Sequence, residues 1–153
     1  MQHFSEAMFL LSVMGEGTFI DLLRYIEQFA PDETTAEIAR RARADEARHV
    51  HFGMAHIRYA LAADPMLYQR LEKAVFHRAA TLHQLDSVPA PIQDALTVLA
   101  AGGTDPKSIR SGAEHFRQLR HTMFENRIKR LQNIGFSLEQ SEVLSGKHTA
   151  NFM

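Results

Sequence analysis

The chain has 153 residues, of which 45% are hydrophobic, a formal net charge of −1 and no cysteine. This length and hydrophobic content suffice for one modest domain with a buried core, and the balanced charge gives no overall field for binding nucleic acid or an acidic membrane surface. The lack of cysteine excludes disulfide bonds and thiolate metal sites.

The N-terminal segment offers no targeting signal. Its short apolar run, in MQHFSEAMFLLSVMG, has no basic stretch before it and is interrupted by Glu6, so neither a signal peptide nor a membrane span is predicted. We therefore expect a cytoplasmic protein in which residues 1–153 form a single domain.

The first predicted helix covers about residues 4–29, with Ser5 as its N-cap and Pro31 as its stop. It carries Glu16 in the apolar context VMGEGTF. The residues that share a helical face with Glu16 are mostly apolar: Phe9, Ser12, Val13, Phe19, Ile20, Leu23 and Glu27. An unpaired acid buried in such a stripe costs several kcal/mol, so we expect Glu16 to be neutral or to face a cation.

Two glycines, Gly15 and Gly17, flank this acid, and each weakens a helix by about 1 kcal/mol relative to alanine. Two interpretations fit them. They leave room for a metal, for dioxygen or for a partner backbone, or they serve a kink or a close contact between helices. Both interpretations stay open from the sequence alone.

The second predicted helix covers about residues 34–63 and follows the turn PDETT. Thr34 followed three residues later by Glu37 predicts a capping box at its start. This helix carries the only Glu-x-x-His of the chain, formed by Glu46 and His49. The same stripe holds mostly small or polar residues, which would leave a cavity: Ala39, Ala42, Val50, Gly53 and His56.

The two helices bring these acids and the histidine together if they pair antiparallel. A turn centred near residue 32 places Glu16 opposite residue 48, one turn from both Glu46 and His49. Helix axes about 8–10 Å apart would let the three side chains converge. A lone Glu-x-x-His is common by chance, so the prediction depends on the mirrored position of Glu16. Two carboxylates and an imidazole that converge in a helix pair form half of a di-iron carboxylate site.

This pattern, one glutamate and then Glu-x-x-His in the wording DEARH about thirty residues later, resembles the ferritin-like superfamily of non-haem di-iron carboxylate proteins. Members of that superfamily use the pattern twice around two metals, and this sequence contains it once. By position, Glu16, Glu46 and His49 match the metal ligands of one half-site, with Glu46 as the bridging ligand. The resemblance implies two iron or manganese ions per completed site.

The resemblance also implies a partner, because one chain supplies three ligands and two metals need about six. Either a homodimer completes a four-helix bundle from two hairpins, or the chain is the C-terminal half of a longer protein whose N-terminal half completes it. The implied function is an oxidoreductase that activates dioxygen or peroxide, with a small-molecule substrate that the sequence does not identify. The alternatives are a ferroxidase that handles iron itself and a non-catalytic helical half-bundle that has lost its metal site.

Two further residues are candidates for the surroundings of the metal. In the ferritin-like pattern the acid before the ligand glutamate, here Asp45, often accepts a hydrogen bond from a ligand histidine on another helix, which fixes the imidazole tautomer. Its alternative is a local pair with Arg48 or Arg41. His56 lies two turns along the stripe and is either a proton relay or a histidine satisfied by ordinary hydrogen bonds. His51 is expected on the surface.

The fold class predicted is all-α, because no alternating strand pattern exceeds four residues. A ferritin-like helical hairpin over residues 1–63 is expected to carry the metal site, and residues 64–153 to add accessory helices. Proline and glycine signals delimit helices at about residues 65–85, from Pro89 and Pro91 to about 101, and at 106–134. A last short helix is predicted over 138–145.

The predicted helix over 106–134 holds seven Lys and Arg between residues 107 and 130. Aromatic residues are not interleaved with them and no nucleic-acid motif is present, so a solvated face is predicted. Glu114, His121 and Glu125 fall on adjacent turns there, but none belongs to a Glu-x-x-His, and a second ligand set is not predicted.

Overall fold

The computed structural model describes residues 2–82 and 89–147, and of residues 2, 3 and 82 it describes the backbone alone. Every regular element in these ranges is helical, which confirms the all-α prediction for this part of the chain. The elements are α1 (Gln2–Met8), the π-helical segment η1 (Phe9–Glu16), α2 (Gly17–Phe29), α3 (Glu33–Ala63), α4 (Leu67–Leu82), α5 (Ala90–Ala101), α6 (Pro106–Ile134) and α7 (Leu138–Lys147). The last three residues predicted for the helix over 65–85 lie outside the described residues. None of the described helices combines the length and the apolar character that crossing a membrane requires.

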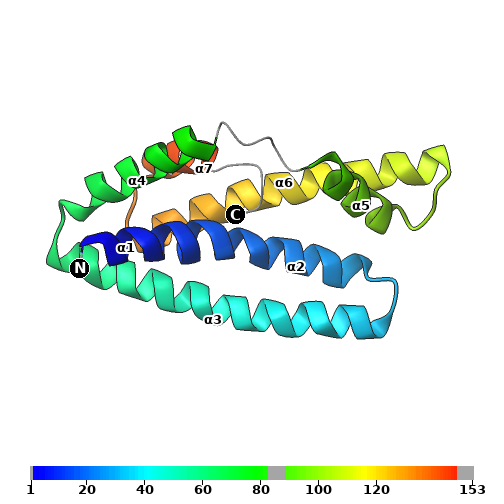
Figure 1. Cartoon of the computed structure of the whole chain (residues 1–153), viewed down its shortest axis with the longest axis horizontal. Helices are drawn as coiled ribbons and strands as arrows, with labels where there is room; N and C mark the ends of the chain where they lie inside the picture. Colours follow the sequence, from blue (N-terminus) through cyan, green and yellow to red (C-terminus); the bar gives the residue numbers. More distant parts are fainter. Residues whose placement is uncertain (1, 83–88, 148–153) are drawn as a thin grey trace.

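The long hairpin is present. α1, η1 and α2 form one continuous rod that runs antiparallel to α3 (Figure 1). Asp32 is the N-cap of α3, because its carboxylate accepts a hydrogen bond from the Thr35 amide at 2.8 Å. The capping box predicted from Thr34 and Glu37 is therefore wrong. With Asp32 satisfying the free amides, α3 starts one residue earlier than predicted, and the Glu37 carboxylate pairs with arginines one turn further on.

Ser5 does not cap the first helix, which corrects the prediction. α1 already begins at Gln2, and Ser5 is buried within it. Its hydroxyl lies 3.0 Å from Nε2 of His56 on α3 and is hydrogen-bonded to it. A serine inside a helix can satisfy a partner on a neighbouring helix, and here it ties the two helices together at the end of the hairpin remote from the turn.

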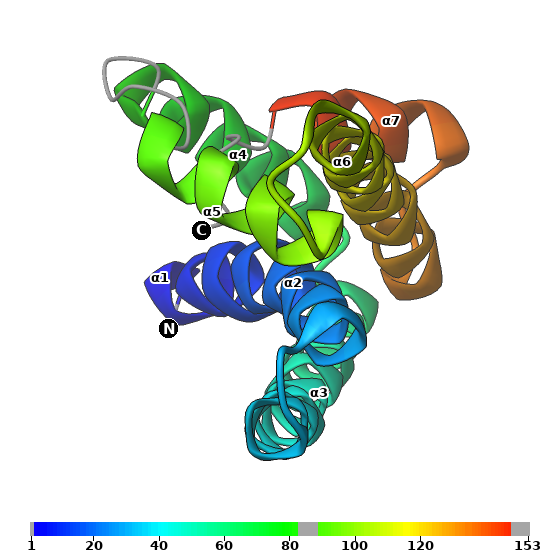
Figure 2. The ribbon, with the colours of Figure 1, turned by 90° about the vertical axis from the view of Figure 1, so that its right-hand side faces the viewer.

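The helices after α3 cover one side of the hairpin. α5 and α6 form a second helical hairpin, which closes at Gly102 with a left-handed φ of 63°. α6 begins at Asp105, whose carboxylate accepts a hydrogen bond from the Lys107 amide at 2.9 Å. Figure 2 shows α2 between α3 and α5, so that α3 lies at the edge of the molecule.

Two hydrophobic clusters hold these helices against the hairpin. The first joins η1, the C-terminal part of α3, α4, the end of α6 and α7, and its fully buried side chains are Phe9, Val13, Met14, Ile57, Leu71, Leu131 and Leu144. The second joins α2, α5 and α6 through Leu22, Tyr25, Leu96, Phe116, Leu119 and Met123. The Tyr25 hydroxyl donates a hydrogen bond to the Leu96 carbonyl at 3.0 Å, which fixes α5 on α2. Much of the apolar face of the first helix is thus covered within the chain itself, but Phe19 of the predicted stripe is 37% exposed.

Candidate metal centre

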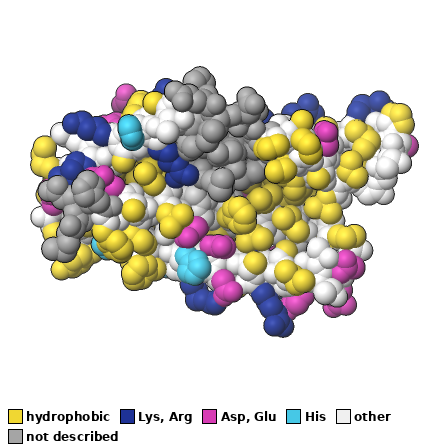
Figure 3. Space-filling view, in the orientation of Figure 1, with side chains coloured by type: hydrophobic (Ala, Val, Ile, Leu, Met, Phe, Trp, Pro, Cys, Tyr) yellow, Lys and Arg dark blue, Asp and Glu magenta, His cyan; other side chains and the backbone are white. Residues whose placement is uncertain are grey.

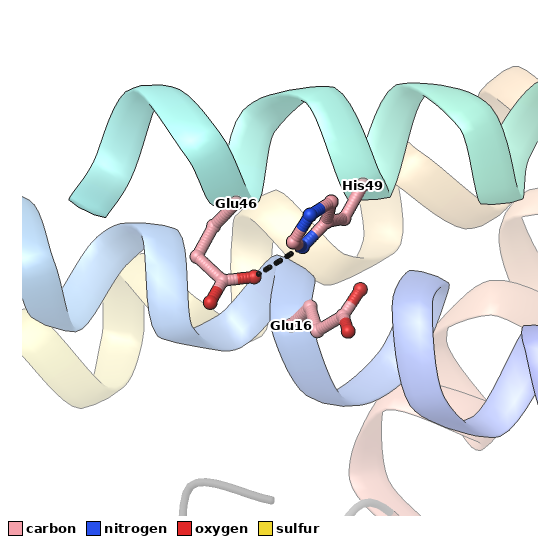
Figure 4. Close-up of side chains that lie close together, drawn as sticks. All are labelled: Glu16, Glu46 and His49. Atoms are coloured by element: carbon pink, nitrogen blue, oxygen red, sulfur yellow. Dashed lines mark hydrogen bonds and ion pairs between the residues drawn. The ribbon is translucent and has the colours of Figure 1, made fainter. Parts of the chain in front are cut away.

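Glu16, Glu46 and His49 converge between the two helices of the hairpin. Glu16 is the last residue of η1, and the other two lie one turn apart on α3. One ligating atom from each side chain lies within 4.8 Å of the other two, and Figure 4 shows the three side chains directed toward one another. Glu46 Oε2 and His49 Nδ1 are 3.3 Å apart. The convergence expected from the position of the turn is therefore present.

The cluster opens to solvent on one side and is buried on the other. The His49 side chain is 60% exposed and that of Glu46 is 27% exposed, whereas Oε2 of the half-buried Glu16 is buried without a hydrogen-bond partner. Figure 3 shows acidic and histidine side chains on this face, between two groups of hydrophobic side chains. A buried carboxylate oxygen without a hydrogen-bond donor is energetically unfavourable. A cation or a hydrogen-bond donor bound next to Glu16 Oε2 would therefore stabilise the cluster.

Glu16 ends a π-helical segment that was not predicted. The Gly17 amide donates to the carbonyl of Ser12, five residues earlier, where an α-helix would use the residue four earlier. Gly15 and Gly17 are poor α-helix formers, so leaving α-helical geometry at this point costs little free energy. π-Helical segments are rare and often occur at functional sites.

Two side chains bind carbonyl groups of the π-helical segment. Arg78 Nη1 donates a hydrogen bond to the Leu10 carbonyl at 2.9 Å, and Thr18 Oγ1 donates to the Met14 carbonyl at 2.8 Å. Burial lowers the pKa of the Arg78 guanidinium. These bonds satisfy backbone acceptors in the segment where the regular helical pattern changes.

The wider turn of η1 changes which residues of the rod are buried. Phe9 and Val13 are buried within the π-helical segment, and Leu22 and Tyr25 are buried after it. A regular α-helix would have kept Glu16 in the middle of the buried stripe, as the sequence pattern predicted. The π-helical segment instead moves Glu16 to the edge of that stripe, where it faces α3.

Two of the small residues near the site serve close contacts between helices. A Cβ added to Gly53 would lie 2.5 Å from Ser12 Cβ, and a Cβ added to Gly17 would lie 2.4 Å from Arg130 Nε. Distances this short do not occur in real structures, so a side chain at Gly53 would have to move Ser12 and one at Gly17 would have to displace Arg130. Both glycines therefore serve close packing. This is the second of the two interpretations drawn from the sequence for Gly17.

The residues considered for the surroundings of the metal have partners within the chain. Asp45 is exposed and accepts a hydrogen bond from Arg48 on the same helix, which was its alternative interpretation. His56 is hydrogen-bonded to Ser5, and its ring meets that of Phe4 edge-on with 5.1 Å between centroids. His51 is exposed, as predicted.

The three residues considered on the helix over 106–134 do not form a second ligand group. Among the described residues, the only three His, Asp or Glu side chains that bring ligating atoms within 4.8 Å of one another are Glu16, Glu46 and His49. Glu114 is exposed and pairs with Arg117, one turn away on α6.

A buried pair of cations, which the sequence patterns did not predict, lies next to the site. Five of the seven basic residues of α6 are exposed, which confirms the predicted solvated face for these five. Arg127 and Arg130 are largely buried, and for these two the prediction is wrong. Arg127 Nη2 donates to Thr18 Oγ1 at 3.1 Å, and its Nη1 donates to the Ser145 carbonyl at 3.2 Å. The signal was present in the periodicity, since Arg127 lies four residues after the buried Met123 on the apolar stripe of α6.

A single buried carboxylate, Asp21, faces this pair. Asp21 Oδ2 lies 3.9 Å from Arg130 Nη1, and its Oδ1 accepts a hydrogen bond from Asn126 at 2.8 Å. Burial raises the pKa of the Asp21 carboxyl, against the opposing effects of Asn126 and Arg130. Burial also lowers the pKa of Arg127 to about 9 and that of Arg130 to about 10. All three shifts have the same cause, the removal of charge from water.

Comparisons with protein families, with curated protein sequences and with solved structures gave no match for this chain.

Proposed function

We propose that Glu16, Glu46 and His49 bind iron or manganese as one half of a two-metal carboxylate site, and that the protein is an oxidoreductase acting on a small molecule. The observation that carries this proposal is the convergence of two carboxylates and an imidazole within 4.8 Å. Exposed acids often gather without a metal. Here, however, an imidazole joins them and one Glu16 oxygen is buried without a partner.

The geometry of the cluster fits a single ion. Carboxylate oxygens and imidazole nitrogens bind divalent metals at about 2.0–2.2 Å, so two ligands of one ion lie at most about 4.4 Å apart. Side chains whose ligating atoms are within 4.8 Å reach that range with small rotations. A divalent cation would also remove the repulsion between two neighbouring carboxylates. Oxygen and imidazole ligands without thiolate suit manganese and iron.

Each ligand has a role that follows from its position. By its position in the Glu-x-x-His pattern, Glu46 would be the bridging carboxylate, with Glu16 and His49 as terminal ligands. The bound metals would supply electrons for reaction with dioxygen or peroxide. His49, at 60% exposure, leaves the site open to a small-molecule substrate from the solvent side.

Metal content tests this proposal. Protein purified without chelators is analysed for bound elements, and binding of Fe(II) and Mn(II) is titrated by calorimetry without oxygen. Glu16→Ala, Glu46→Ala and His49→Ala are each expected to weaken binding by more than about tenfold, because losing even the outer partner of a metal ligand costs about 10–100-fold. Glu114→Ala is the control, because Glu114 is an exposed glutamate that also pairs with a residue one turn away.

Three results would change the conclusion. Wild-type protein that binds neither iron nor manganese overturns the proposal and leaves a non-catalytic helical protein. Binding of zinc alone keeps a metal site but removes the oxidoreductase function. Continuous oxidation of Fe(II) without any organic substrate identifies a ferroxidase.

A further inference from the structure

We infer that a second copy of this chain packs against an exposed apolar stripe of α3 and completes the metal site across a two-fold axis. The stripe consists of Ile38, Phe52 and Tyr59. The inference rests on the proposed function for the ligands that it brings together, but the stripe itself is a property of the metal-free chain.

The stripe is exposed although its residues are large and apolar. Ile38 is 64% exposed, Phe52 is 63% exposed and Tyr59 is 79% exposed. They occupy three of four positions spaced seven residues apart on α3, and Asp45 occupies the fourth. A seven-residue spacing keeps side chains on one side of a helix, as at the seam between two packed helices. α3 lies at the edge of the molecule (Figure 2), so nothing in the described part of the chain prevents another helix from docking there.

The stripe adjoins the candidate ligands. Phe52 lies three residues after His49 and Asp45 four residues before it, so both are neighbours of His49 on the helix surface. A helix that packs on the stripe would therefore lie along one edge of the open side of the metal cluster, beside His49. This places any partner that uses the stripe next to the site.

The stripe is symmetric about the ligands, which selects a second copy as the partner. An antiparallel α3 that brings Ile38 opposite Tyr59 of the other copy also brings Asp45 opposite Phe52. The axis of this pairing passes between Arg48 and His49. A two-fold contact requires such self-complementarity, and a second copy would also bring a second set of the same three candidate ligands to the site.

The second copy would supply what one chain lacks. Each chain offers three ligands, and two metals need about six. In the antiparallel pairing both His49 side chains lie near the axis, and Asp45 of one copy lies within a turn of His49 of the other. Asp45 would then be able to accept a hydrogen bond from that imidazole and fix its orientation.

Light scattering of the full chain tests the pairing. Wild-type protein is expected to have about twice the mass of 17.3 kDa, both without metal and with Mn²⁺. Phe52→Lys is expected to shift the protein toward the monomer, because it places a charge in the centre of the seam. Ile92→Lys is the matched control, since Ile92 is also an exposed large apolar residue but lies on α5. Circular dichroism checks that both variants keep their helices.

Cysteine trapping tests the position of the axis. The chain contains no cysteine, so a single introduced thiol can form a disulfide only with its copy. Arg48→Cys lies beside the proposed axis and is expected to form a dimer on mild oxidation, because a disulfide requires Cα atoms within about 7 Å. His51 is also exposed and lies nearly as close along the helix, but on a different side from the stripe. His51→Cys is therefore expected to stay a monomer under denaturing conditions.

The outcomes separate this inference from the proposed function. If the protein is a monomer and binds iron or manganese, the proposed dimer is wrong and the proposed metal site stands. A dimer trapped through Arg48→Cys that binds no metal supports the interface and overturns the metal function. Efficient trapping of His51→Cys, or a Phe52→Lys protein that stays dimeric, overturns the pairing along the stripe.

Discussion

Arg130 Nε lies where a side chain on Gly17 would begin, since an added Cβ there would be 2.4 Å away. The buried guanidinium of α6 therefore rests against the rod one residue after Glu16. This contact links the helix that carries a candidate ligand to the buried charges of the second helical hairpin.

Gly17→Ala is expected to destabilise the protein by about 1–3 kcal/mol, because the new methyl group forces Arg130 out of its position. Urea unfolding followed by circular dichroism measures the change. Gly146→Ala is the control, because Gly146 lies in α7 and a methyl group added to it would have no neighbouring atom within 4 Å. That change is expected to stabilise the protein by up to about 1 kcal/mol. Equal effects of both substitutions would contradict the tight contact.

Asp21→Ala is expected to destabilise the protein by about 3–5 kcal/mol. Removing the one buried carboxylate leaves Arg127 and Arg130 without a compensating negative charge. Arg24→Ala is the control, because Arg24 is an exposed partner of the same carboxylate at 3.8 Å. Removing the Arg24 side chain should destabilise the protein by at most about 1 kcal/mol. A larger destabilisation by Arg24→Ala than by Asp21→Ala would contradict the role given to Asp21.

Acid is expected to weaken the hairpin through Glu27. Hydrogen bonds from Arg40 and Arg43 lower the pKa of the Glu27 carboxyl, so its ionised form is favoured in the folded state. The stabilisation is present above the ordinary pKa and is lost as pH falls through the lowered folded-state pKa. Glu27→Gln should therefore flatten the loss of stability between about pH 6 and about pH 3, measured by urea unfolding. Glu114→Gln, whose partner lies on its own helix, should leave that slope unchanged.

Metal binding is expected to raise thermal stability. Mn²⁺ at about one hundred times its Kd should add about 2.7 kcal/mol to the free energy of unfolding. Differential scanning calorimetry with and without the ion measures this gain. Glu46→Ala should abolish the gain, and a full gain in that variant would rule out Glu46 as a ligand.

The hairpin was predictable because its signals are local and periodic. Long apolar stripes, Pro31 and the PDETT turn place both helices within a few residues of their observed ends. The turn position alone then brings Glu16 near Glu46 and His49, since antiparallel helices fix which residues face one another.

What sequence patterns could not reveal depends on contacts between distant segments. The π-helical segment changes the phase of the first helix, and it is held in part by Arg78 from α4, which lies 68 residues from its partner. The burial of Arg127 likewise depends on Thr18 and Ser145, on two other helices. A prediction from helical periodicity takes the helix geometry as constant and charged residues as facing solvent. The first condition is not met in η1, and the second is not met at Arg127.

The π-helical segment has an obvious alternative, because the same residues could form ordinary α-helical hydrogen bonds. The eight residues of η1 share one hydrogen-bond register, and a return to α-helical bonding would rotate Glu16 about the rod axis while α2 stays packed against α5 and α6. An ion that binds this carboxylate and moves it toward α3 would therefore change the backbone hydrogen bonds of η1 as well as the side-chain rotamer of Glu16. Amide hydrogen exchange between Phe9 and Glu16 would then respond to occupancy of a site formed by only one of those residues.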